Sequence, residues 1–292
     1  MRTMKRTLPR RTALVAAALL ALTLSGCGPS GSGGDTVRVG VSGDSTDWDV
    51  LAEEAAKQGL KVEVVPFDDY SLPNKALAAG DIDLNAFQHL VFLAQSNTEN
   101  GTDITPLAAT NVVPLGLYSQ RAKKLADLPD GARIAHPNDP ANEGRALRLL
   151  AKAGLITLKP GTGLYATADD IAGNPRHLKL TPVNAQQTPR LLKDVDASVI
   201  NDGVATLAGV KADTALFKDD PRGADVRPYV NVIASRAKDK DDPRFAKIVK
   251  LYASKPVQDE ARRTSNGTAV HIDLSRAELT RELARVTRQL KG

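Results

Sequence analysis

The chain has 292 residues, with 39 Lys and Arg against 34 Asp and Glu, and aromatic residues make up 4% of it. Five of the basic residues and none of the acidic ones fall within residues 1–26, so the remainder is balanced in charge. This balance, together with the lack of a basic patch interleaved with aromatics, argues against a nucleic-acid-binding protein. The single cysteine, Cys27, excludes an intrachain disulfide and a cysteine-rich metal site.

The N-terminus has the parts of an export signal. A basic head that ends at Arg10-Arg11 precedes an apolar run over residues 13–24, which is too short to favour a mature membrane span. The sequence Leu-Ser-Gly-Cys that ends at Cys27 resembles the lipobox of bacterial lipoproteins, which implies cleavage after residue 26 and a lipid on the cysteine. Residues 27–35 would then tether the protein flexibly to the extracytoplasmic face of the cell membrane. A plain secretory signal with an incidental cysteine is the alternative, and both the general secretory and the twin-arginine routes stay open.

Strands and helices alternate after this tether. Alternating valines predict a strand over 37–41, a helix follows over 48–58, and a second strand covers 61–67. Strand, helix and strand at this spacing form a βαβ unit and therefore a parallel sheet. Helices are expected next over 73–79 and 90–96, and strands over 82–87, 104–109, 112–118 and 132–135.

Residues 136–150 are the most informative stretch. Asp139-Pro140 predicts the start of a helix, because the acidic side chain can cap it and proline suits its first position. Apolar residues at helical spacing then supply a buried stripe, and Gly154 ends the helix. Free N–H groups at this helix start and the guanidinium of Arg145 suit a carboxylate or phosphate ligand, although an ordinary capped helix with a surface arginine would look the same.

The second half repeats the alternation and ends in an amphipathic helix. Helices are expected over 167–172, 189–194, 204–208, 242–253, 256–264 and 276–290, and strands over 178–183, 197–200, 228–235 and 269–272. Residues 73–85 and 189–201 share one plan of proline, short helix, acidic turn, apolar strand and asparagine. Because open α/β sheets bind ligands at the carboxyl ends of their strands, Asn85 and Asn201 are expected to face one cleft between two similar lobes.

Motifs for catalysis or metal binding are missing from the sequence. None of the four histidines has a second histidine or a cysteine at metal-ligand spacing, and no nucleophile elbow, P-loop or H-E-x-x-H motif is found. We therefore expect no metal, no cofactor and no enzymatic activity, although carboxylates distant in sequence could still meet in space.

Five blocks together carry a resemblance to a known family. Residues 67–74, 80–89, 137–145, 199–201 and 228–231 resemble, in order and approximate spacing, the methionine-binding lipoproteins of the NlpA family. The resemblance implies a lipid-anchored substrate-binding protein that delivers L-methionine or a close analogue to an ABC importer. It also implies an α/β, two-lobed, periplasmic-binding-protein-like fold of type II, in which each lobe is a mainly parallel sheet flanked by helices and the ligand lies in the cleft between the lobes.

The resemblance further implies a set of ligand-binding residues, namely Tyr70, Phe87, His89, Phe92, Asn142, Arg145, Asn201 and Asn231. Arg145 would take the ligand carboxylate, for which a planar guanidinium is well suited. Asn201 and Asn231 would bind the amino-acid backbone. The aromatic residues and the histidine would line the thioether pocket, where polarizable walls suit a methionine tail. Phe87 could equally be a core residue and His89 a half-buried histidine with its hydrogen bonds satisfied.

Departures from the family pattern leave the ligand open. Phe92 stands where relatives often have tyrosine, and Val204 stands where some have tyrosine after the Val-Ile-Asn strand. A methionine derivative, a small methionine-containing peptide or another apolar amino acid are therefore alternatives. Competing interpretations from other classes are a secreted α/β enzyme acting on a small carboxylate, and an adhesive surface lipoprotein with a vestigial cleft.

The expected organisation is a signal peptide over 1–26, the lipidated cysteine and tether over 27–35, one lobe over 36–118 plus 226–292, and a second lobe over 119–225. We expect a monomer whose partners are methionine or an analogue, the membrane permease of the importer and, through the lipid anchor, the membrane. The helix over 276–290 has no counterpart that we recognise in the family.

Overall fold

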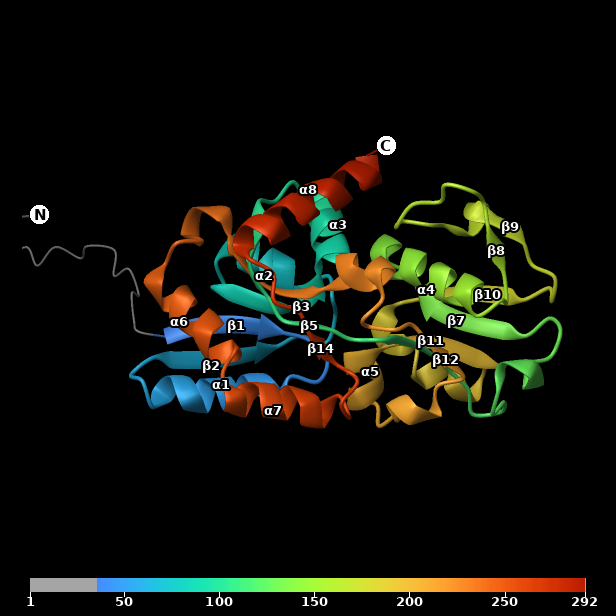
Figure 1. Ribbon diagram of the computed structural model, residues 1–292, viewed down its shortest axis with the longest axis horizontal. Helices are drawn as coiled ribbons and strands as arrows, with labels where there is room; N and C mark the ends of the chain where they lie inside the picture. The colour runs from blue at the N-terminus through green and yellow to red at the C-terminus, as the bar shows by residue number, and fades with distance from the viewer. Residues whose placement is uncertain (1–35, 292) are drawn as a thin grey trace, which may run out of the picture. The chain divides into compact units, whose positions relative to one another are not determined.

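The computed structural model describes residues 36–291, which belong to one compact unit. The predicted signal peptide, the lipobox and the tether lie outside the described residues. Two five-stranded sheets carry the fold, and Figure 1 shows them side by side with helices along their faces. Among residues 36–291 no helix is long and apolar enough to cross a membrane.

The first sheet has the strand order β2-β1-β3-β13-β4. Its strands are β1 (Thr36–Val41), β2 (Lys61–Pro66), β3 (Leu84–His89), β4 (Ile104–Ala109) and β13 (Asn231–Arg236). β1 pairs in parallel with β2 and β3, whereas β13 pairs antiparallel with β3 and β4. One strand therefore runs opposite to the other four, which agrees with the predicted mainly parallel sheet.

The second sheet has the order β10-β7-β11-β6-β12. Its strands are β6 (Leu115–Tyr118), β7 (Arg133–Pro137), β10 (Lys179–Val183), β11 (Ala197–Asn201) and β12 (Phe217–Lys218). β7 pairs in parallel with β10 and β11, and β6 pairs antiparallel with β11 and β12. In each sheet the antiparallel strand is the first one formed after the chain crosses from the other sheet. It is β6 where the chain enters the second sheet and β13 where it returns to the first.

The first crossing between the sheets occurs earlier than predicted. The continuous strand expected over 112–118 is wrong, because Val113-Pro114 separates β5 (Asn111–Val112) from β6. Proline has no N–H to donate to a ladder, so it ends the first pairing. β5 pairs with β14 (Val270–His271), while β6 joins the second sheet although the predicted boundary at residue 118 assigned it to the first lobe.

Helix α4 (Pro140–Lys152) confirms the prediction made from its start signals. The side chain of Asp139 accepts a hydrogen bond from the backbone N–H of Asn142 (2.9 Å), and Pro140 occupies the first turn. The helix packs closely at Gly144, where an added Cβ would lie 2.1 Å from the carbonyl oxygen of Leu164. Arg145 is not a surface residue, since only 4% of it is exposed.

The remaining helices cover the sheets. They are α1 (Thr46–Ala56), α2 (Pro73–Ala79), α3 (Leu90–Asn100), α5 (Asp202–Leu207), α6 (Pro243–Tyr252), α7 (Lys255–Thr264) and α8 (Arg276–Lys291), and β8 (Thr157–Leu158) and β9 (Ile171–Gly173) form a separate hairpin. The predicted helices over 167–172 and 189–194 are only short 3₁₀ segments. The terminal helix is amphipathic as predicted: Leu279 and Val286 are fully buried, and Figure 1 shows α8 lying over α3.

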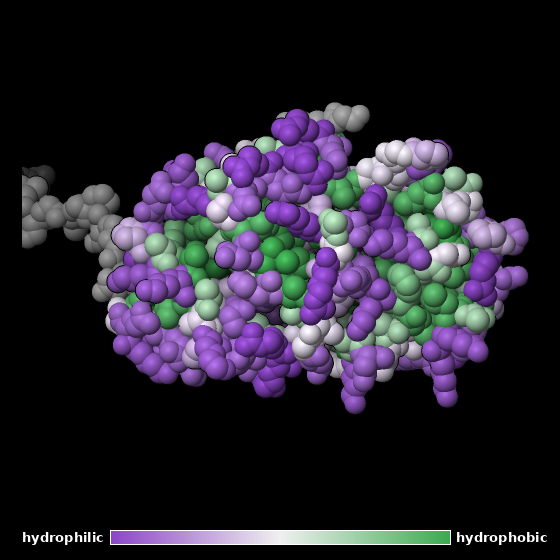
Figure 2. Space-filling view, viewed as in Figure 1, coloured by the Kyte–Doolittle hydropathy of each residue, from purple (hydrophilic) through white to green (hydrophobic). Residues whose placement is uncertain are grey.

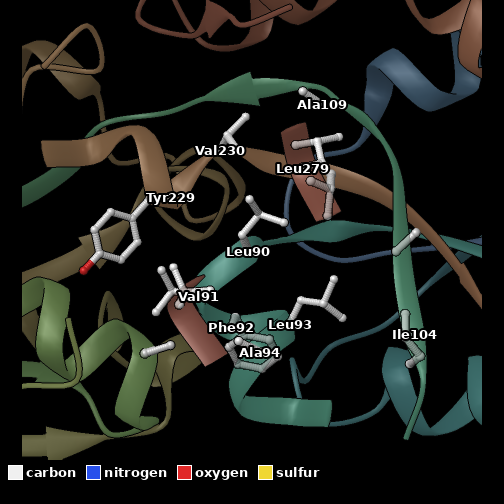
Figure 3. Close-up of a cluster of buried hydrophobic side chains, with 14 of the residues drawn as sticks. Leu90, Val91, Phe92, Leu93, Ala94, Ile104, Ala109, Tyr229, Val230 and Leu279 are labelled. Atoms are coloured by element: carbon white, nitrogen blue, oxygen red, sulfur yellow. The ribbon is translucent and has the colours of Figure 1, made fainter. Parts of the chain in front are cut away.

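Hydrophobic clusters stabilise the two halves, and one of them joins residues of both. One contains Leu90, Val91 and Leu93 of α3 with Leu279, and Figure 3 shows Tyr229 at its edge with the hydroxyl directed away from the leucines. Another packs α4 against β6, β7 and β11. On the face shown in Figure 2, hydrophilic residues predominate at the periphery, and apolar residues are visible between them over both halves.

Candidate functional site

A cavity of about 140 Å³ lies between residues contributed by both sheets. All eight residues expected to bind a ligand line it: Tyr70, Phe87, His89, Phe92, Asn142, Arg145, Asn201 and Asn231. An apolar cavity of roughly 150 Å³ accepts benzene, so this space is of the size that a small molecule fills, not a long peptide. The structure thus brings together side chains from segments as much as 161 residues apart in the sequence.

Three aromatic rings form one wall of the cavity. Tyr70 follows β2, Phe87 lies on β3, and Phe92 lies in the first turn of α3. The ring centroids are 5.9 Å apart for Tyr70 and Phe87, 6.1 Å for Tyr70 and Phe92, and 5.7 Å for Phe87 and Phe92. Burial raises the pKa of the Tyr70 hydroxyl, which stays neutral at physiological pH. Phe87 is only partly buried: it lines the cavity and also packs against the core. The expectation of a pocket residue and that of a core residue are therefore compatible.

His89 is buried and held in one orientation. Its Nδ1 accepts a hydrogen bond from the backbone N–H of Phe92 (3.1 Å) and thereby caps α3. The proton of the neutral ring therefore belongs on Nε2, which lies 3.2 Å from Oδ1 of Asn142 and donates to it. Burial, followed by the positive charge of Arg145, lowers the pKa of His89 to about 3, so the ring is neutral at every physiological pH.

A chain of amide hydrogen bonds orients Asn201. The Nδ2 of Asn142 donates to the carboxylate of Asp139 (3.0 and 3.1 Å), which fixes Oδ1 of Asn142 as an acceptor. That oxygen accepts from Nδ2 of Asn201 (2.8 Å). Oδ1 of Asn201 is consequently left buried, and it has no hydrogen-bond partner among the described residues. A buried acceptor without a partner is costly, so this atom is placed to accept a donor from a ligand.

Arg145 is held by an acidic residue that the sequence did not point to. Oδ2 of Asp219 accepts from Nε (3.1 Å) and lies 2.9 Å from Nη2, and Nη2 also donates to the carbonyl of Val113 (2.8 Å). The guanidinium carbon lies 4.7 Å from the centroid of the Tyr229 ring, in a cation–π arrangement. Within residues 36–291 no hydrogen bond uses Nη1. A ligand carboxylate would therefore meet Nη1 of the guanidinium, because Asp219 already occupies the Nε/Nη2 edge.

The two other asparagines differ in their surroundings. Asn231 begins β13 beside His89, is partly exposed and lines the cavity. Asn85 does not, so the expectation that it faces the cleft is wrong. It is fully buried in β3, where Nδ2 donates to Oδ1 of Asn74 (2.8 Å) and Oδ1 accepts from Gln88 (2.9 Å). β3 continues past Asn85 and ends at His89. The strand end that lines the cavity is therefore His89 and not Asn85.

Sequence reasoning missed the acidic residues of the cavity. Asp44, Asp47 and Asp202 line it, and Asp219 lies behind Arg145. No local sequence pattern distinguishes these aspartates as cavity residues, because aspartates are common in turns and at helix starts. Burial is the main cause that raises the pKa of both Asp47 and Asp202 to about 6. Residues 36–291 contain no group of three or more His, Cys, Asp or Glu side chains that could hold a metal ion.

Comparison with known proteins identifies the family. The profile of the NlpA lipoprotein family matches residues 37–272, which is most of the chain. The chain belongs to the NlpA lipoprotein family. Helix α8 lies outside the matched residues of the family profile.

Named proteins and solved structures are similar to this chain over nearly their whole length. The D-methionine-binding lipoprotein MetQ of Yersinia pestis is 41% identical over 264 residues, covering 88% of this chain and 96% of that protein. The structure of protein PG110 from Staphylococcus aureus has a TM-score of 0.83 at 44% identity and covers 86% of this chain and 99% of its own. A nutrient-binding protein from Burkholderia cenocepacia, solved bound to methionine, has a TM-score of 0.76 at 43% identity, with coverages of 80% and 99%.

Proposed function

We propose that this protein is an extracytoplasmic, lipid-anchored solute-binding protein that binds methionine or a close analogue and delivers it to the membrane permease of an ABC importer. The observation that carries the proposal is the buried, unpartnered Oδ1 of Asn201 in a cavity that also contains a guanidinium and an aromatic wall. These are the three features that a zwitterionic amino acid with a thioether tail needs. Relatives about 40% identical are named for methionine binding, which supports the same ligand.

Each end of the ligand has a matching group in this proposal. The carboxylate meets Nη1 of Arg145, whose position is fixed by Asp219 and by the Val113 carbonyl. The ammonium donates to Oδ1 of Asn201. The thioether contacts the rings of Tyr70, Phe87 and Phe92, where each sulfur–aromatic contact contributes roughly 0.3 to 1.5 kcal/mol. A cavity of about 140 Å³ favours a single amino acid over a methionine-containing peptide.

We infer binding without turnover. His89 has both ring nitrogens engaged, by the N–H of Phe92 and by Asn142, and its pKa of about 3 makes it a poor proton acceptor at neutral pH. Its role in this proposal is to hold Asn142 and, through it, Asn201. Because no observation favours an enzyme or an adhesin, we propose neither.

The domain organisation in this proposal follows the sheets. One lobe comprises residues 36–112 and 231–291, the other residues 115–218, and the two crossings between them serve as the hinge. Hydrogen bonds join the two lobes at several points: the N–H of Asp44 donates to the carbonyl of Gly203 (3.2 Å), and Nδ2 of Asn184 donates to Asp69 (2.9 Å), in addition to the contact between His89 and Asn142. We propose that the protein acts as a monomer anchored through a lipid on Cys27, which lies outside the described residues.

Calorimetric titration of wild type and an Asn201→Ala variant tests the proposal, with both methionine enantiomers, norleucine and a methionine dipeptide as ligands. We expect methionine to bind most tightly and the variant to bind it about 10- to 100-fold more weakly, because a hydrogen bond to a charged group contributes roughly 1.5 to 3 kcal/mol. Asn138→Ala, at an exposed asparagine near the start of α4 that does not line the cavity, is the matched control and should leave affinity unchanged. Failure of wild type to bind either enantiomer would overturn the proposal.

A further inference from the structure

Asp202 is a buried carboxylate without a counter-ion. It is the first residue of α5, directly follows Asn201 and lines the cavity. Only two acidic residues of the described chain are more than nine-tenths buried, Asp202 at 8% exposed and Asp219 at 6%. Asp219 pairs with Arg145, whereas the side chain of Asp202 makes no hydrogen bond or ion pair with any of residues 36–291. Proteins rarely bury a carboxylate unless it is paired, so this arrangement is incomplete without a ligand.

The charges around Asp202 do not neutralise it. Asp44, from the loop after β1, opposes its ionisation, whereas Arg145 on α4 and Lys218 on β12 favour it. Arg145 is already paired with Asp219, and Lys218 is exposed to solvent. Burial has the largest effect and raises the pKa of Asp202 to about 6, so the side chain is still mostly ionised at pH 7.5. The negative charge in turn contributes to the raised pKa values of two neighbouring hydroxyls, those of Tyr70 and Tyr118.

The cavity therefore lacks a cation on the side of Asn201. The unpartnered Oδ1 of Asn201 belongs to the residue next to Asp202, and both are acceptors on the wall of one cavity. Among the positively charged side chains of residues 36–291, only Arg145 lines this cavity. Two acceptors, one of them charged, are suited to a group with several N–H donors and a positive charge, which is the description of a primary ammonium.

We propose that Asp202 is the counter-ion of the ligand's α-ammonium and determines specificity for amino acids over their deaminated analogues. The inference rests on the proposed function, since it assigns the partner of one end of the same ligand. The ammonium lies between Asp202 and Oδ1 of Asn201, and the carboxylate meets Arg145. A ligand with the same carboxylate and thioether but no ammonium leaves Asp202 unpaired and is rejected, because the cavity then contains a buried charge without compensation.

The test uses Asp202→Asn, with Asp213→Asn as the matched control. Asp213 lies in the segment that follows α5, is exposed to solvent and does not line the cavity. Calorimetry at pH 7.5 compares L-methionine with 4-(methylsulfanyl)butanoate, which lacks the amino group. We expect Asp202→Asn to lower methionine affinity about 10- to 100-fold and to leave or raise affinity for the butanoate. Asp213→Asn should change methionine affinity less than about threefold, because its charge is exposed to solvent outside the cavity.

Two further readouts separate ligand recognition from a structural role. The ligand-free Asp202→Asn variant should unfold at the same or a higher temperature than wild type, because an unpaired buried charge has been removed; a structural role would lower it. Methionine affinity of wild type should fall as pH drops from 7 to 5, and Asp202→Asn should flatten that dependence. Asp47 accepts a hydrogen bond from the Tyr252 hydroxyl (3.0 Å), and its pKa is also about 6. Any pH dependence of affinity that remains in Asp202→Asn is therefore assigned to Asp47.

The outcomes are distinct. If wild type binds methionine and Asp202→Asn binds it equally well, or if the variant is destabilised without its ligand, the counter-ion assignment is overturned while the proposed function stands. An Asp202→Ser variant provides the same comparison if asparagine prevents folding. If wild type does not bind methionine at all, the proposed function itself fails.

Discussion

Replacing Asp219 with asparagine should destabilise the protein strongly without altering any residue that lines the cavity. In the wild type Oδ2 receives Nε of Arg145 (3.1 Å) and lies 2.9 Å from Nη2, while Oδ1 accepts the N–H of Leu115 (2.8 Å). Both side chains of the ion pair are 5% exposed. Asparagine has one carbonyl oxygen, so either the guanidinium or the Leu115 amide loses its acceptor, and the buried guanidinium loses its counter-charge.

The magnitude follows from this geometry. Two unit charges about 3 Å apart interact by about 5 kcal/mol at an effective dielectric constant of 20. Removing one partner of a buried pair typically costs about 3 to 5 kcal/mol. We therefore expect the free energy of unfolding to fall by about 3 to 5 kcal/mol, a large part of the 5 to 15 kcal/mol that typical proteins have.

Urea unfolding followed by tryptophan fluorescence measures this loss. Trp48 is the only tryptophan of the chain and is 3% exposed, so its emission reports unfolding directly. Asp241→Asn is the control, because Asp241 pairs with Arg276 (2.7 Å) but its side chain is 74% exposed; its loss should cost less than about 1 kcal/mol. Saturating methionine should restore more stability to Asp219→Asn than to wild type, since the ligand carboxylate supplies a new partner for Arg145. Equal stability of Asp219→Asn and wild type would refute the reasoning.

Two other substitutions test the aromatic wall and the packing of α4. Phe87→Leu should weaken methionine binding about 2- to 10-fold and norleucine binding less, because the sulfur–aromatic contact is lost; equal losses in calorimetry would contradict this. Gly144→Ala should lower the free energy of unfolding by about 1 to 3 kcal/mol or more, since its Cβ would lie 2.1 Å from the Leu164 oxygen and 2.8 Å from the Ala166 nitrogen. Gly163→Ala, with no atom within 4 Å of the added Cβ, should be neutral in the same urea titration, and an unaffected Gly144→Ala would show that the helix can shift.

The elements that the sequence predicted well are those with local signals. Helix α4 begins where Asp139-Pro140 predicts, because capping and proline geometry are properties of neighbouring residues. The valine alternation of β1 and the apolar stripe of α8 likewise report burial directly. The strand expected over 112–118 failed because alternation continues across Val113-Pro114, and only pairing in space shows that β5 and β6 belong to different sheets.

The candidate site was likewise predicted from the sequence only in part. The family resemblance placed eight residues around one ligand, and the structure brings all eight to one cavity. It did not anticipate that Arg145 already pairs with Asp219, 74 residues away in the sequence, because a long-range ion pair leaves no local pattern. The orientation of Asn201 depends on Asn142 and Asp139 in turn, a relation that only coordinates can give.

The central claim is that the cavity holds one methionine with its two charged ends separated. A crystal structure of the protein with L-methionine tests this most directly. We predict the ligand carboxylate at Nη1 of Arg145, the ammonium within hydrogen-bond distance of Oδ1 of Asn201 and of Asp202, and the thioether against Phe87. A methionine bound with its ammonium away from both acceptors, or bound outside this cavity, would contradict the account.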